Sequence, residues 1–209
     1  MIDLITKYGT HCEILYRDVS ENIRRKNFAT LKSKNIKIIA KTMNSFVNME
    51  LFDGIIFKNA KSAGRITNEI QNFEESIRTF VSMYPNKAII PCGGVGNKSD
   101  VDNLLSIGST AVGIGTLFAF SSESCISTNT KNKIIQKTKE DIIRFEMSQN
   151  VKQNAILFSN WNKDDDINHS KSLQAGILNS NEGHIFVGEA INHINSIKTF
   201  QNIVDDLTL

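Results

Sequence analysis

Short apolar runs of strand length alternate with amphipathic segments along this 209-residue chain. The apolar runs occupy residues 12–16, 36–40, 54–57, 87–92 and 110–114. Capping serines and apolar residues at helical spacing predict helices at 20–34, 67–83 and 99–107, and a long polar helix is expected at 130–149. Strands that are apolar throughout and separated by helices predict a parallel sheet covered by helices. About five such units fit either a doubly wound sheet or part of an eight-stranded βα barrel.

The charge and cysteine content exclude several classes of protein. The chain has 24 Lys+Arg and 22 Asp+Glu, a net charge of +2, which argues against a nucleic-acid partner. It has no run of about 18 apolar residues, so no membrane-spanning helix is expected, and its start does not resemble a secretory signal. Three cysteines far apart, Cys12, Cys92 and Cys125, argue against a disulfide framework and favour the cytoplasm.

Half of the 12 glycines lie within one short block, as Gly93, Gly94, Gly96, Gly108, Gly113 and Gly115. Gly93 and Gly94 follow a predicted strand and precede a predicted helix, and Gly115 and Thr116 follow the next strand. Glycine at such a turn lets a phosphate approach backbone N–H groups, and a helix N-terminus favours its negative charge. Two such turns on neighbouring strands predict a phosphate site of the kind that βα barrels build. The alternative is that these glycines only make tight turns. Gly108 is expected to end the preceding helix.

The same block resembles a known family. Its residues read IIPCGGVGNKSDVDNLLSIGSTAVGIGTLFAFSSES. This run is similar to the nitronate monooxygenase (2-nitropropane dioxygenase-like) family, in which a strand, a GG-I/V-G turn, a short helix, another strand and GT-x-F follow one another. The resemblance implies an FMN-dependent βα barrel that oxidises alkyl nitronates with dioxygen. By the same resemblance, Gly93, Gly94, Gly115 and Thr116 would hold the FMN phosphate.

The chain departs from the family at one motif, roughly Q/E-G-x-E-A-G-G-H, which aligns with residues 58–65 (KNAKSAGR). Lys58 stands at the position that faces the flavin, and Arg65 stands where the family has its catalytic histidine. Arginine stays protonated, so Arg65 cannot act as a general base, but it can stabilise an anion. The alternative is that Arg65 is a solvated loop residue. His184, in the C-terminal segment, is a candidate for the missing base.

The resemblance also predicts the extent of the domain. Residues 1–209 are expected to form a single partial FMN-binding barrel domain that lacks about the first three βα units, with a C-terminal extension from about residue 150. Three explanations stay open: the chain is a fragment, a homo-oligomer or a second chain completes the barrel, or the N-terminal residues pair in another way. A small-molecule substrate and dioxygen are the expected partners, and no metal is expected because no histidine stands at ligand spacing. Two other functions stay open: an enoyl reductase-like flavin barrel that uses a nicotinamide cofactor, and a non-catalytic flavin-binding homologue.

Overall fold

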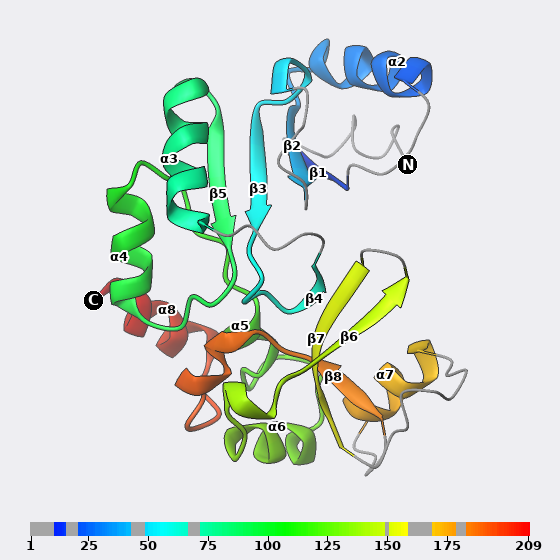
Figure 1. Cartoon of the computed structure of the whole chain (residues 1–209), viewed down its shortest axis with the longest axis vertical. Helices are drawn as coiled ribbons and strands as arrows, with labels where there is room; N and C mark the ends of the chain where they lie inside the picture. The colour runs from blue at the N-terminus through cyan, green and yellow to red at the C-terminus, as the bar shows by residue number, and fades with distance from the viewer. Residues whose placement is uncertain are drawn as a thin grey trace. The chain divides into compact units, whose positions relative to one another are not determined.

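The chain folds as two compact units in a computed structural model that describes residues 11–15, 21–42, 49–66, 72–148, 151–158, 169–178 and 183–209. The described residues up to Lys58, within 71–91 and within 104–112 form the first unit. Those within 59–70, 92–103 and 113–209 form the second. Figure 1 follows the elements along the chain. The prediction of one domain with an extension from about residue 150 stays a prediction.

The first unit contains the four-stranded sheet that the apolar runs predicted. Its strands are β1 (His11–Leu15), β2 (Lys37–Thr42), β3 (Gly54–Lys58) and β5 (Ala88–Cys92), in the order β1-β2-β3-β5. The first two pairings are parallel, with Cys12 opposite Ile38 and Ala40 opposite Ile55. Neighbours in this sheet follow the order of the chain, without the reversal that a doubly wound sheet has at its switch point. The order therefore favours the barrel type of the two architectures.

Aromatic side chains hold the helices of the first unit in place. Phe28 of α2 (Glu21–Lys32) packs edge-on against Phe52, which follows the short helix η1 (Met49–Leu51), with ring centroids 5.3 Å apart. Phe57 of β3 contacts Phe73 and Phe80 of α3 (Phe73–Met83) at 5.4 and 5.2 Å. The helices predicted at 20–34 and 67–83 are confirmed with shorter bounds, and 67–71 lies outside the described residues.

The next helix, α4 (Lys98–Ser106), is followed two residues later by Gly108, which the sequence predicted to end it. Gly108 has a φ of +100°, and its N–H donates to the carbonyl of Leu105. A Cβ at this position would lie 2.8 Å from a methyl group of Val81. Both the backbone conformation and the close packing therefore require glycine here.

The second unit is built on an antiparallel sheet (Figure 1). β6 (Ile143–Ser148) pairs with one edge of β7 (Val151–Leu157), and β4 (Gly64–Ile66) and β8 (His184–Phe186) pair with successive parts of the other edge. The other elements are α5 (Thr116–Ala119), α6 (Thr128–Ile135), η2 (Lys139–Asp141), α7 (His169–Ile177), η3 (Glu189–His193) and α8 (Phe200–Thr208). A cluster of buried residues joins several of them: Phe120, Ile134, Ile156, Ile185, Val187, Ile191 and Ile194.

Two predicted elements are wrong. The long helix expected at 130–149 is the short helix α6 followed by η2 and strand β6. Phe145 is buried and Arg144 exposed, which is the alternation of a strand, and pairing with β7 outweighs the local helical tendency. The strand expected at 110–114 is reduced to one bridge, between Gly113 and Cys92. None of the described helices is long and apolar enough to cross a membrane.

The start of α8 is held by a carboxylate from far along the chain. The backbone N–H of Phe200 donates to both oxygens of Glu123, at 2.9 and 3.1 Å. The ring of Phe200 also packs edge-on against Phe118, with centroids 5.3 Å apart. The bond from Phe200, assisted by one from the Ser122 hydroxyl, holds the pKa of Glu123 below its ordinary value of 4.5.

We expect acid to weaken this attachment. A carboxyl whose pKa is lower in the folded state stabilises the fold above its unfolded pKa, and loses that contribution as pH falls through the folded pKa. Glu123→Gln should therefore be less stable than the wild type at pH 7, and the difference should shrink below pH 4.5. Urea unfolding of both proteins across this range measures the difference. A gap that is equal at all pH values would contradict the prediction.

Replacing Gly108 should destabilise the protein while replacing Gly115 should not. Gly108→Ala forces an alanine into a left-handed conformation against Val81, which costs about 1–3 kcal/mol. Gly115 has a φ of −120° and no atom within 4 Å of an added Cβ, so Gly115→Ala should change stability by less than about 0.5 kcal/mol. Urea unfolding compares the two, and equal effects would refute this account of Gly108.

Candidate active site

One backbone bridge brings the two glycine turns together within the second unit. Cys92, directly before Gly93, forms a parallel bridge with Gly113, two residues before Gly115. Parallel neighbours run in the same direction, so the segments that follow them leave the bridge side by side. The turns at 93–94 and 115–116 are therefore neighbours, as the sequence pattern expected.

The first turn is packed tightly against the segment that follows β3. Gly93 and Gly94 have φ values of +115° and +76°. Asn59 donates from Nδ2 to the carbonyl of Gly93, and Ser62 from Oγ to the carbonyl of Cys92, each at 3.0 Å. A Cβ on Gly93 would lie 2.1 Å from Asn59 Oδ1. Close packing is therefore sufficient to explain the glycine at position 93. This agrees with the alternative that the glycines of this block only make tight turns.

A single buried asparagine, Asn154, fixes the segment after β3. Asn154 of β7 donates from Nδ2 to the carbonyls of Ala60 and Ser62, at 2.8 and 2.9 Å. Its Oδ1 accepts a hydrogen bond from Nε of Arg144, whose Nη2 also donates to the carbonyl of Ala60. Because both ends of the amide are used, the carbonyls have fixed positions, and so has the backbone around Lys61.

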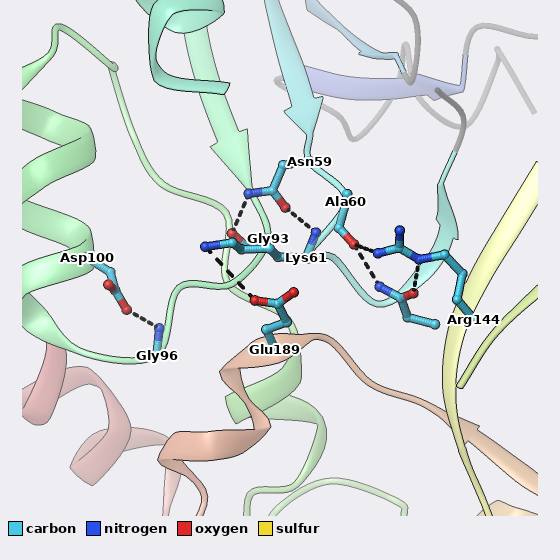
Figure 2. A network of polar contacts seen from close by, with 9 residues as sticks. Asn59, Ala60, Lys61, Gly93, Gly96, Asp100, Arg144 and Glu189 are labelled. Carbon is cyan, nitrogen blue, oxygen red and sulfur yellow. Dashed lines mark hydrogen bonds and ion pairs between the residues drawn. The ribbon is translucent and has the colours of Figure 1, made fainter. Parts of the chain in front are cut away.

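Residues 188–189 connect this segment to the second turn. The N–H of Gly188 donates to Oγ1 of Thr116 at 3.0 Å, and the N–H of Glu189 donates to the carbonyl of Lys61 at 2.9 Å. The ammonium of Lys61 lies 4.0 Å from the carboxylate of Glu189 (Figure 2). The side chain of Thr116 is buried and its oxygen accepts a bond from the backbone, so it has a structural role in addition to any role in binding.

Several backbone N–H groups of the two turns point to no protein acceptor. Over the described residues, no protein atom accepts the N–H of Gly94, Gly115 or Thr116. The space beside Gly115 is open as far as the described residues are concerned, since none of their other atoms lies within 4 Å of an added Cβ. The N–H groups of Gly96 and Asn97 are different, because the carboxylate of Asp100 accepts both and occupies the start of α4.

The other predicted site residues belong to three different strands. Lys58 ends β3, in the first unit, and is half-buried. The backbone of Arg65 belongs to β4, opposite Gln153, and its side chain lies outside the described residues. His184 is buried in β8, with Nδ1 2.8 Å from the Ser172 hydroxyl.

His184 is also enclosed by aromatic rings. Its ring packs against those of Phe145 and Phe186, with centroids 5.8 and 5.2 Å away. These contacts give the histidine a packing role. Among the described residues, no group of three or more His, Cys, Asp or Glu side chains is placed to hold a metal ion.

Sequence reasoning missed four residues that build the site: Asn59, Lys61, Asn154 and Glu189. Asn59 and Lys61 lie in the aligned motif, at positions where the family has glycine and glutamate. This difference from the family could have drawn attention to them. No local pattern marks Asn154 or Glu189, because their roles depend on contacts between segments distant in the chain.

Removing the amide of Asn154 should destabilise the fold. Asn154→Leu leaves the carbonyl of Ser62 without its amide donor and breaks the bond to Arg144, which costs about 2–3 kcal/mol. Gln136→Leu, at an exposed position after α6, is the matched control and should change stability by less than about 0.5 kcal/mol. Urea unfolding followed by circular dichroism measures both, and two similar curves would contradict the role given to Asn154.

Solved structures share this fold. FabK from Thermotoga maritima superposes with a TM-score of 0.78 at 18% identity, over 99% of this chain and 69% of that one. A nitroalkane oxidase from Streptomyces ansochromogenes gives a TM-score of 0.70 at 10% identity, over 99% of this chain and 65% of that one. At such low identity the likeness concerns the fold alone.

The family follows from the sequence match. A search among curated proteins finds no match. A model of the nitronate monooxygenase family matches residues 52–209, most of the chain and all of the candidate site. The chain therefore belongs to the nitronate monooxygenase family, and this membership supports a flavin-dependent oxidoreductase.

Proposed function

We propose that the chain binds FMN and oxidises alkyl nitronates with dioxygen. The observation that carries the proposal is the bridge between Cys92 and Gly113, which sets two glycine turns side by side with N–H groups that no described protein atom accepts. Family membership supports a flavin cofactor and an oxidoreductase activity.

The residues of the turn pair fit a phosphate group. A phosphate carries several acceptor oxygens and pairs well with backbone N–H donors at glycine turns. Gly94, Gly115 and Thr116 supply such donors, and the open space beside Gly115 leaves room for approach. Gly93 allows the close packing that shapes the first turn. The carboxylate of Asp100 already accepts the N–H of Gly96 before α4, so this donor is not available to a phosphate. The two turns would together hold the phosphate through Gly93, Gly94, Gly115 and Thr116, and the bound flavin would supply the redox chemistry.

The substrate follows from the charge of the segment after β3. Residues 58–65 contain Lys58, Lys61 and Arg65 and no acidic residue. Arg65, at the position of the family's histidine, stays protonated, so it binds an anion and accepts no proton. An alkyl nitronate is already deprotonated, and its oxidation needs no base at this position. A neutral nitroalkane must first lose a proton from carbon, and Arg65 cannot take it.

The arginine in place of the family's histidine also favours a second candidate function. A flavin-binding protein without turnover would keep the turn pair and tolerate the loss of the histidine. It would retain flavin and leave it oxidised with every substrate. An enoyl reductase-like protein would instead show bleaching of the flavin by NADPH.

The flavin content of the purified protein tests the proposal. The 209-residue protein is mixed with excess FMN, free cofactor is removed, and the visible spectrum is recorded. We expect retained flavin bands that an alkyl nitronate bleaches without oxygen and that return on admission of air, with no bleaching by the parent nitroalkane. A colourless protein overturns the proposal, and retained flavin that no nitronate bleaches supports the non-catalytic alternative.

Gly115→Ala separates cofactor binding from folding. The added methyl group occupies the open space beside the turn without straining the fold, so stability should be unchanged. FMN should bind roughly tenfold more weakly, the effect of losing one hydrogen bond to a charged group. Fluorescence quenching of FMN on titration with protein gives the dissociation constant. A variant that binds FMN like the wild type would remove Gly115 from the phosphate site.

A further inference from the structure

We propose that Lys61 is a ligand of the cofactor phosphate. When the phosphate binds, the ammonium of Lys61 leaves the carboxylate of Glu189 and contacts the phosphate instead. The inference rests on the proposed function, because it concerns the same pair of turns. It adds a charged side chain to a site that otherwise consists of backbone N–H groups, and it names the group with which the phosphate competes.

The stem of Lys61 lies directly over the first glycine turn. An added Cβ on Gly94 would be 2.9 Å from Cδ, 3.1 Å from Cβ and 3.6 Å from Cγ of Lys61. Any side chain at position 94 would therefore displace the lysine. Glycine at this position leaves the N–H of Gly94 and the side chain of Lys61 next to each other, where one anion can meet both.

The backbone of Lys61 is fixed while its ammonium is held loosely. Its N–H donates to Oδ1 of Asn59 at 2.9 Å, and its carbonyl accepts the N–H of Glu189 at 2.9 Å. The side chain of Lys61 is 61% exposed, and its ammonium is 4.0 Å from the Glu189 carboxylate, which is 35% exposed (Figure 2). The base of the side chain is therefore fixed beside Gly94, and its end can move.

The ion pair with Glu189 is weaker than others in the same unit. The pairs Lys98–Asp102, Lys137–Asp141 and Lys198–Asp206 have N–O distances of 2.9, 3.0 and 2.8 Å. At 4.0 Å the pair of Lys61 has no direct hydrogen bond, and exposed ion pairs contribute little even at shorter distance. A phosphate carries more charge than a carboxylate, so it competes well for the ammonium.

Glu189 has the opposite effect on a bound phosphate. Its carboxylate lies next to the turn pair, since residue 188 donates to Thr116 and residue 189 to Lys61. A negative charge there repels a phosphate, and Lys61 offsets that repulsion. Removing the lysine and removing the glutamate should therefore change FMN affinity in opposite directions.

Affinities for FMN and riboflavin test the inference, because the two ligands differ only in the phosphate. Fluorescence titration gives both dissociation constants for the wild type and for Lys61→Met, which keeps the stem over Gly94 and removes the charge. We expect Lys61→Met to bind FMN about fivefold more weakly and riboflavin as the wild type does. Lys61→Arg should restore most of the FMN affinity, and Glu189→Gln should raise it about twofold.

The matched control is Lys137→Met, which removes a lysine whose side chain is 38% exposed and which pairs with Asp141 in the same unit. It should leave both affinities unchanged. If Lys61→Met binds FMN as the wild type does, or loses FMN and riboflavin equally, the inference is wrong while the proposed function stands. A wild-type protein that binds neither ligand overturns both.

Discussion

The hydrogen bonds of Asn154 are the interaction on which the site depends. The segment after β3 has no ladder of its own until β4, so its buried carbonyls need donors from elsewhere. One side chain of β7 supplies donors to two of them, and Arg144 completes the amide's own bonding. The position of Lys61, and through Asn59 the position of the Gly93 turn, follow from this arrangement. A strand far along the chain thus positions the turn that sequence reasoning treated as local.

The glycines between positions 93 and 115 are required for different reasons, and the structure separates these reasons. Gly93 is required by the contact with Asn59, and Gly108 by its backbone conformation against Val81. Gly96 would place a Cβ 2.1 Å from the ring of His193. Gly115 has no positive φ and no neighbour within 4 Å among the described residues, and it is the residue that caps the start of α5, where glycine is common. Under the proposed function, the open space beside it would admit the phosphate.

The sequence predicted those parts of the fold that local patterns determine. Continuous apolar runs identified β2, β3 and β5, since a buried parallel strand is apolar on both faces. The polar run after α6 misled the analysis, because Phe145 and Arg144 alternate only over a short strand whose partner, β7, supplies the stabilisation. The turn pair could be predicted from glycine spacing. Asn154 and Glu189 could not, because a single asparagine or glutamate in the sequence gives no sign of which carbonyl or ammonium it will meet.

The charge of the segment after β3 limits the chemistry that the proposed site can perform. Residues 58–65 contain Lys58, Lys61 and Arg65 and no acidic residue, and an arginine stays protonated. The proposed site would stabilise anions, such as a phosphate or a nitronate, and would not activate a carbon acid. His184, a candidate for the missing base, is buried between Phe145 and Phe186 instead. Under the proposed function the substrate would arrive already ionised, and the arginine at position 65 would account for a preference for a nitronate over its parent nitroalkane.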